Sequence, residues 1–255
     1  MQWFEKEDFW IQFAPIMFDD ARWAEAPTVA RYVKQLSEAK TVLDAGCGLG
    51  RIAVELASLG LDVTGVDIIQ SELEAAAESA QAEGVSLKLL KKDLRQLDMN
   101  EAFDCVINLY TSFGYCATVE EDLLILKNMI RAVKKGGTFI IECTSRETAI
   151  MYWTPGEEFE RAGYRVVTEF AVQGAWEGLV SRWKLYPLAE AAIEQESANE
   201  QKPIVEHCFV QRLYPAAFLR DKLLEFGMTS AQVYGDFDKS PYDQNARTMI
   251  LIGKK

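Results

Sequence analysis

The sequence predicts an α/β protein built on a doubly wound, mostly parallel sheet of seven strands, with a three-stranded antiparallel sheet inserted before the last helix. Two observations support this fold class. Over residues 41–143 short apolar runs alternate with amphipathic stretches, as expected for strands that helices cover on both faces. Over residues 164–214 three strand-like runs follow one another without a helical stretch between them, so they are expected to pair antiparallel.

The elements follow from these patterns in chain order. Apolar runs predict strands at 41–45, 62–67, 86–90, 103–109 and 138–143, and the stretches between them predict helices near 52–59, 71–82 and 120–134. The inserted strands are expected at 164–172, 179–187 and 204–214, with a polar, glutamate-rich connector at 188–202. A helix at 215–226 and strands at 229–234 and 248–253 then complete the large sheet.

This order of elements predicts three parts. Residues 37–150 and 215–255 are expected to form the nucleoside-binding domain, and residues 151–214 are expected to form an antiparallel cap over its cleft. Residues 1–36 carry aromatic side chains at helical spacing. They are expected to form either a helical lid over the site or an ordinary helix packed on a sheet.

Composition and charge exclude several classes of function. The 255 residues carry a net charge of -12, and such a field repels phosphate backbones, which argues against a nucleic-acid partner. No apolar run approaches the length of a membrane span, and the acidic start of the chain does not resemble a secretory signal. Five cysteines without a C-x-x-C pair and a single histidine predict a reducing, cytoplasmic setting and no metal site. No feature predicts an oligomeric state.

A glycine-rich turn after the first strand is the strongest functional signal. Glycines occupy positions 46, 48 and 50, and the next strand ends in Asp67. Glycine allows the backbone to approach a ligand closely, and an acid at the end of the second strand is placed to accept hydrogen bonds from ribose hydroxyls. A dinucleotide fingerprint would need glycine at position 51, where this chain has arginine. A nicotinamide-dependent oxidoreductase is therefore disfavoured, although it remains an alternative.

The pattern Asp-x-Gly-x-Gly-x-Gly, opened by Asp44, resembles motif I of the class I, Rossmann-like methyltransferases that use S-adenosyl-L-methionine (SAM). The resemblance covers residues 40–145 and 215–255. Within that class the chain is similar to small-molecule enzymes that carry an antiparallel insertion before the last helix. The resemblance implies SAM as the cofactor, S-adenosyl-L-homocysteine (SAH) as the product, and a small-molecule methyl acceptor.

The same resemblance implies the role of each cofactor-binding residue. The motif I turn holds the methionine part of SAM, Asp67 binds both ribose hydroxyls, and Asp93 accepts a hydrogen bond from the adenine amino group while Leu94 offers a backbone contact. Either Arg51 or Arg22 could meet the cofactor's carboxylate. The complete implied set is Asp44, Gly46, Cys47, Gly48, Gly50, Asp67, Ile68, Asp93, Leu94, Asn108 and Leu109.

The implied reaction is methyl transfer to a nitrogen or oxygen of the acceptor. Tyr110 and Tyr115, which follow the fourth strand, are candidates to line the acceptor pocket. Nucleic-acid amino-methylating enzymes often read Asn/Asp-Pro-Pro-Tyr at this strand end, whereas this chain has Asn108-Leu109-Tyr110-Thr111. His207 is a candidate general base if its strand faces the cleft, and otherwise a histidine on the sheet surface. Two alternatives stay open: transfer of the cofactor's aminopropyl group, and a protein that binds SAM or SAH without turnover.

Overall fold

The computed structural model describes residues 2–188 and 202–255, so the predicted connector lies outside the described residues except for its two ends. Sheet A has seven strands in the order β10-β11-β5-β4-β1-β2-β3, and all neighbours are parallel except β11, which is antiparallel to both β10 and β5. This confirms the predicted doubly wound sheet. The strands are β1 (Thr41–Ala45), β2 (Asp62–Asp67), β3 (Lys88–Lys91), β4 (Phe103–Asn108), β5 (Val133–Cys143), β10 (Ser230–Tyr234) and β11 (Met249–Lys254).

Helices cover both faces of sheet A. One face packs against α5 (Val119–Ala132) and α7 (Ala216–Glu225), and the other packs against α2 (Asp20–Ser37) and α3 (Arg51–Ser58). The shorter α6 (Arg146–Met151) follows β5, and α4 (Gln70–Ala82) contacts β3 and α3.

Successive side chains of each strand point to opposite faces of sheet A, and apolar side chains on both faces explain why helices cover both. In β1, Val42 belongs to the core on the α2 and α3 side, whereas Leu43 belongs to the core on the α5 and α7 side. Neighbouring residues of β5, Ile140 and Ile141, divide in the same way. Because successive side chains point to opposite faces, a strand buried on both faces reads as a continuous apolar run.

Sheet B is the inserted antiparallel sheet, and it has four strands rather than the three expected. Its strands are β6 (Gly156–Arg161), β7 (Tyr164–Gln173), β8 (Gly178–Pro187) and β9 (Val205–Arg212). The missed strand, β6, pairs only with β7 at the edge of the sheet. Its sequence, Gly-Glu-Glu-Phe-Glu-Arg, is mostly charged, which is how edge strands avoid pairing with other chains.

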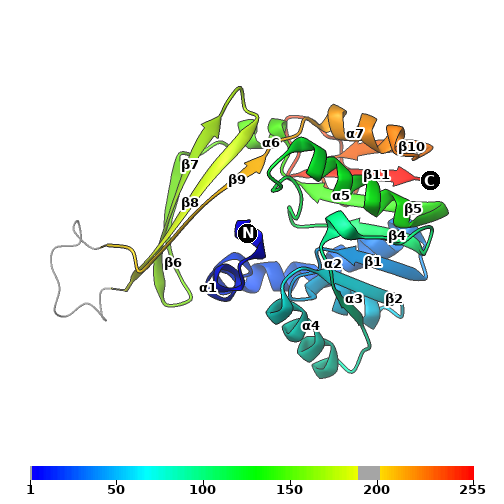
Figure 1. Ribbon diagram of the computed structural model, residues 1–255, viewed down its shortest axis with the longest axis horizontal. Coiled ribbons are helices and arrows are strands. Elements are labelled where there is room, and N and C mark those ends of the chain that lie inside the picture. The colour runs from blue at the N-terminus through cyan, green and yellow to red at the C-terminus, as the bar shows by residue number, and fades with distance from the viewer. Residues whose placement is uncertain (1, 189–201) are drawn as a thin grey trace.

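The N-terminal segment connects the two sheets. A short 3-10 helix, η1 (Trp3–Glu5), leads into α1 (Glu7–Met17), and Figure 1 shows α1 between sheet B and sheet A. Phe9, Phe13 and Ile16 of α1 pack against Val166 and Phe209 of sheet B in a separate apolar core. The helix therefore covers one face of the inserted sheet.

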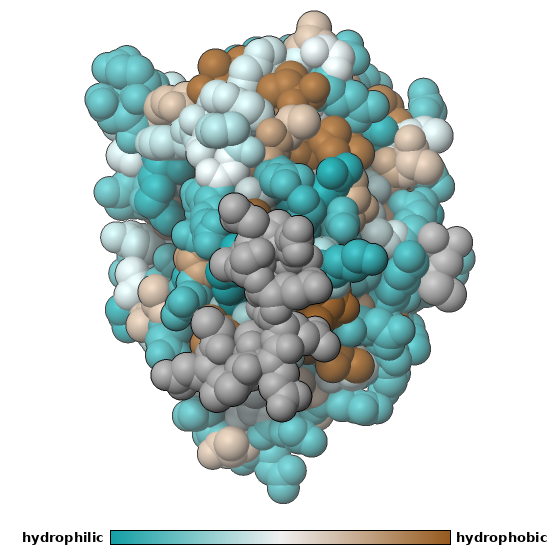
Figure 2. Space-filling view, turned by 90° about the vertical axis from the view of Figure 1, so that its left-hand side faces the viewer, coloured by the Kyte–Doolittle hydropathy of each residue, from teal (hydrophilic) through white to brown (hydrophobic). Residues whose placement is uncertain are grey.

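The outer face of sheet B is polar. Cross-strand ion pairs join Glu169 of β7 to Arg182 and Lys184 of β8. Figure 2, which looks at the molecule from the side of this sheet, shows a mainly hydrophilic surface with hydrophobic residues in small groups, apart from the atoms drawn in grey. In residues 2–188 and 202–255, no helix combines the length and the apolar character needed to cross a membrane.

Candidate functional site

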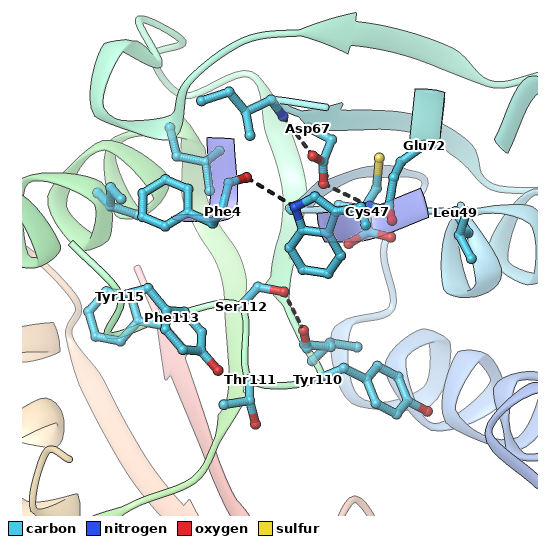
Figure 3. A pocket seen from close by; sticks show the side chains of 18 of the residues that line it. Phe4, Cys47, Leu49, Asp67, Glu72, Tyr110, Thr111, Ser112, Phe113 and Tyr115 are labelled. Carbon is cyan, nitrogen blue, oxygen red and sulfur yellow. Dashed lines mark hydrogen bonds between the residues drawn. The ribbon is translucent and has the colours of Figure 1, made fainter. Parts of the chain in front are cut away.

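A pocket of about 200 Å³ lies at the carboxyl ends of β1, β2 and β4. The chain winds from β1 to β2 on one side and from β4 to β5 on the other, and ligands of open α/β sheets bind where the strand order reverses in this way. Figure 3 shows Asp67, Cys47 and Glu72 grouped on one side of the pocket, with Phe113 and Tyr115 on the other.

The glycine turn forms the floor of the first side. Gly46, Gly48 and Gly50 have φ angles of +81°, +50° and +77°, a region that other residues enter only at a cost. At position 50 a Cβ atom would lie 2.7 Å from the Cβ of Ala76 on α4. Glycine is therefore needed both for the backbone conformation and for the close approach of α4.

Asp67 fixes the turn from the end of β2. Its carboxylate accepts backbone hydrogen bonds from Gly48 at 2.9 Å, Ile68 at 2.7 Å and Ile69 at 3.0 Å. Burial raises the pKa of Asp67, and these N–H groups oppose the shift because they stabilise the charged form. A carboxylate that is held in this way is oriented before any ligand arrives.

Two further buried acids line the same side. Asp44, at 4% exposure, and Glu72, at 5%, both belong to the pocket wall. Burial raises the pKa of Asp44 to about 7; the neighbouring Asp67 adds to this shift and Arg51 opposes it. Burial also raises the pKa of Glu72 to about 8, again with a contribution from Asp67. At neutral pH Glu72 is therefore largely protonated and Asp44 partly so.

Asp93 and Leu94 line the pocket beyond β3. Asp93 accepts hydrogen bonds from the backbone and guanidinium of Arg95 at distances of 2.6–3.1 Å. Arg95 also pairs with Glu5 of η1 at 2.8 Å and with Glu121 of α5 at 3.3 Å. One guanidinium therefore joins this wall of the pocket to the N-terminal segment.

The fourth strand ends beneath the pocket. Asn108 is fully buried, donates to the carbonyl of Ala45 at 2.6 Å and so ties β4 to the end of β1. Tyr110, with φ of +55°, turns its ring under the guanidinium of Arg51 at 4.2 Å, and Phe18 lies on the same guanidinium at 5.0 Å. Arg51 is 6% exposed, and these cation–π contacts stabilise its burial.

The loop after β4 is clamped by sheet B. Arg212, the last residue of β9, pairs with the fully buried Asp122 of α5, which also accepts a hydrogen bond from Tyr214 at 2.8 Å. The Arg212 guanidinium donates to the carbonyls of three loop residues, Cys116, Ala117 and Thr118. The inserted sheet thus positions one wall of the pocket.

Aromatic side chains dominate the second side of the pocket. Trp3 stacks on Phe209 of β9 at 4.5 Å and meets Tyr115 edge-on at 5.0 Å. Trp10 donates its indole N–H to the carbonyl of Phe4 at 3.0 Å. Residues from the N-terminal segment, from the loop after β4 and from sheet B therefore enclose this side together.

The structure brings most of the predicted residues, Arg51 among them, to one pocket and leaves four outside its lining. One of the four is Arg22, which pairs with Glu25 at 3.0 Å. The predicted residues that line it are Asp44, Gly46, Cys47, Gly48, Asp67, Ile68, Asp93, Leu94, Leu109, Tyr110 and Tyr115. Gly50 and Asn108 support the turn from beneath, as described above.

The fourth residue outside the lining is His207, for which the sequence left two possibilities open, a general base that faces the cleft or a histidine on the sheet surface. Its ring lies edge-on to Phe9 at 5.1 Å and to Phe13 at 5.3 Å. Burial lowers the pKa of His207 because it disfavours the charged imidazolium. The helix α1 packs over this face of sheet B, so the histidine belongs to the aromatic core between them.

Replacing His207 with alanine is accordingly expected to leave the rate of any reaction in the pocket within about threefold of the unmodified protein. The loss should appear instead in stability, since a partly buried ring is removed from an apolar core. Turnover and thermal unfolding of His207→Ala report the two quantities separately. A more than hundredfold fall in turnover with an unchanged unfolding temperature would restore the histidine as a catalytic candidate.

Several lining residues were not predicted. Glu72 lies in a stretch with Glu74 and Glu78 that looks like an ordinary solvated helix face, and nothing local marks it as buried. Phe209 and Asp122 reach the pocket through long-range packing of β9 and α5. The N-terminal segment, in contrast, was predictable, because its aromatic residues recur at the spacing of a helix with one apolar face.

A seven-stranded sheet in this order, with a glycine turn held by the acid that ends β2, is the arrangement that the resemblance to Rossmann-like methyltransferases implied. Residues 42–137 match the family model described as "Methyltransferase domain". This match confirms, over that part of the chain, the resemblance seen in its sequence.

Individual relatives agree with this class. The chain is 34% identical over 105 residues to the "Ubiquinone biosynthesis O-methyltransferase" of Rickettsia conorii, a match that spans 41% of this chain and 35% of that protein. It is 32% identical over 117 residues to the protein of the same name in Rickettsia akari, spanning 46% of this chain and 45% of that one. The chain thus matches less than half the length of these curated relatives.

Solved structures extend the likeness of fold to nearly the whole chain. An S-adenosylmethionine-dependent methyltransferase from Clostridium acetobutylicum has a TM-score of 0.76 at 15% identity, covering 96% of this chain and 98% of that one. The CcbJ methyltransferase from Streptomyces caelestis has a TM-score of 0.74 at 18% identity, covering 90% and 94%. SAM-bound CalS10, an amino pentose methyltransferase from Micromonospora echinaspora, has a TM-score of 0.62 at 19% identity, covering 91% and 92%.

Proposed function

We propose that this chain is a SAM-dependent methyltransferase that methylates a nitrogen or oxygen of a small-molecule acceptor. The observation that carries the proposal is the Asp67 carboxylate, which is fixed beside the glycine turn by the N–H of Gly48 at 2.9 Å. The match of residues 42–137 to a methyltransferase domain supports the same reading.

The residues present fit SAM. A ribose diol offers two donors to Asp67, whose oxygens are already oriented by backbone N–H groups. Asp93 and Leu94 line the part of the pocket proposed for adenine, and the buried guanidinium of Arg51 suits the cofactor's carboxylate. When bound, SAM supplies a methyl group activated by a sulfonium leaving group.

The aromatic side of the pocket is proposed to hold the acceptor. Trp3, Tyr115 and Phe209 offer flat apolar surfaces, which suit an acceptor with a ring-shaped or apolar body. Residues 3–18 would act as the lid, excluding water and keeping donor and acceptor aligned. Such alignment contributes roughly 7–11 kcal/mol to catalysis.

The titratable groups on this side limit the kind of acceptor. Burial raises the pKa of both Tyr110 and Cys116 to about 12, and Asp122 is paired with Arg212. None of these three groups is a strong base at neutral pH. The proposed acceptor is therefore a neutral amine, which loses its proton to solvent after the transfer, or a phenol that binds as its phenolate. Neither acceptor needs a strong base on the protein. A relative named as an O-methyltransferase and a structural neighbour named as an amino pentose methyltransferase support both choices.

Titration calorimetry with SAM and SAH, followed by a screen for SAH release with phenols and amino sugars, tests the proposal. We expect binding of both ligands and turnover with at least one acceptor class. Binding of both ligands without turnover on any acceptor would favour a non-catalytic SAM-binding protein. Binding of NAD in place of SAM would favour the oxidoreductase alternative.

A further inference from the structure

Glu72 is a buried acid that the proposed function does not yet use. It lines the pocket from α4 at 5% exposure, and its Oε1 atom has no hydrogen-bond partner among the described residues. Its other oxygen lies directly over the glycine turn, because a Cβ atom at Gly48 would be 2.7 Å from Glu72 Oε2. A buried carboxyl without partners is costly unless a ligand satisfies it.

The surroundings of Glu72 contain no compensating cation. Asp67 and Cys47 lie on the same side of the pocket as Glu72 (Figure 3), and Asp67 is the charged group that acts on it. The Arg51 guanidinium acts on Asp44 and is not among the charges that act on Glu72. None of the ion pairs within residues 2–188 and 202–255 includes Glu72, Asp67 or Asp44. These ranges also contain no group of three or more His, Cys, Asp or Glu side chains arranged to hold a metal ion.

We propose that Glu72 is a cofactor-binding residue that makes the pocket prefer a positively charged nucleoside over an uncharged one. The inference rests on the proposed function. SAM carries one more positive charge than SAH, and a charge that enters a poorly solvated site lined by acids is attracted far more strongly than in water. The site would therefore favour the substrate form of the cofactor and release the product form.

Proton linkage follows from the same arrangement. With a pKa of about 8, Glu72 is largely protonated at neutral pH, and Asp44, with a pKa of about 7, is partly so. A cation favours the charged carboxylates. Binding of SAM is thus coupled to release of up to about one proton from Glu72 and Asp44 to solvent, whereas binding of SAH releases fewer.

The test compares Glu72→Gln with Glu74→Gln, which removes an exposed charge from the same helix. Calorimetry with SAM, SAH and the cationic analogue sinefungin gives the affinities, and repeating it in phosphate and Tris buffers gives the protons released. In Glu72→Gln we expect about tenfold weaker binding of SAM and sinefungin, at most threefold weaker binding of SAH, and reduced proton release. Glu74→Gln should match the unmodified protein.

Thermal unfolding of the ligand-free variant separates this role from a structural one. The folded state raises the pKa of Glu72, so it binds more protons than the unfolded chain between pH 4.5 and about 8, and its stability falls as pH rises through that window. Glutamine stays neutral, so Glu72→Gln should unfold about 2–4 °C higher than the unmodified protein at pH 8. The gain should shrink as pH falls and vanish well below pH 4.5, where glutamate is protonated in both states.

Equal losses for SAM and SAH, unchanged SAM affinity, or the same losses in Glu74→Gln would each overturn the inference while leaving the proposed function standing. An unmodified protein that binds neither SAM nor SAH would overturn the proposed function, and this inference with it.

Discussion

Asp67→Asn is expected to weaken SAM binding by about 30- to 100-fold while the chain stays folded. The carboxylate accepts three backbone hydrogen bonds and lines the pocket, so it both orients the glycine turn and offers charged acceptors to a ribose. Hydrogen bonds to charged groups contribute about 1.5–3 kcal/mol, or roughly 10- to 140-fold in affinity, and the expected loss lies within that range. Asparagine keeps the size of the side chain and one acceptor oxygen, which limits damage to the turn.

The matched control is Asp62→Asn, at the exposed start of the same strand. It removes the same charge far from the pocket and should bind SAM as the unmodified protein does. Calorimetry gives the affinities, and circular dichroism with thermal unfolding verifies that both variants are folded. An affinity of folded Asp67→Asn within threefold of the unmodified protein would contradict the ribose assignment.

Arg212→Ala is expected to lower the free energy of unfolding by about 3–5 kcal/mol, because it leaves the fully buried Asp122 without its cation. For a chain of this size, that loss corresponds to a fall of roughly 6–20 °C in unfolding temperature. Burial already raises the pKa of Asp122, and removal of the arginine should raise it further. The stability deficit should therefore grow as pH rises from 5 to 8, since the folded state then has to hold a lone charge.

Two other variants identify the cause of that loss. Arg182→Ala removes an exposed arginine of sheet B that pairs with Glu169 and Glu206, and such surface pairs contribute at most about 1 kcal/mol. Adding Asp122→Asn to Arg212→Ala should recover part of the stability, because it removes the uncompensated charge. Chemical denaturation measures all three variants. No recovery in the double variant would mean that the lost carbonyl contacts, not the charge, dominate.

Local spacing was enough to predict the parts of the site that depend on one turn. The glycines at 46, 48 and 50 require a tight bend, and Asp67 follows at the end of the next strand, so their meeting depends only on two adjacent parallel strands. Asp93 and Leu94 follow the third strand in the same way. The carboxyl ends of parallel strands share one edge of the sheet, which is why these residues converge on one pocket.

Residues that reach the pocket through tertiary packing could not be predicted in this way. Strand alternation placed His207 on one face of β9, but only the position of α1 decides whether that face meets a pocket or a helix. Glu72 looks like its exposed neighbours until α4 packs on the turn at Gly48. The strand β6 was missed because a charged edge strand lacks the apolar run by which buried strands are recognised.

The guanidinium of Arg95 pairs with both Asp93 and Glu5, so it couples the N-terminal segment to the binding and release of ligands. The pocket has a volume of about 200 Å³, and residues of the N-terminal segment form part of its wall. This volume is below the 300–1,000 Å³ typical of ligand pockets, so we expect residues 3–18 to move when SAM and an acceptor bind together. Such a movement would separate the Glu5 carboxylate from the Arg95 guanidinium, which lie 2.8 Å apart. We expect release of SAH, which requires movement of the N-terminal segment, to limit the turnover rate more than the methyl-transfer step does.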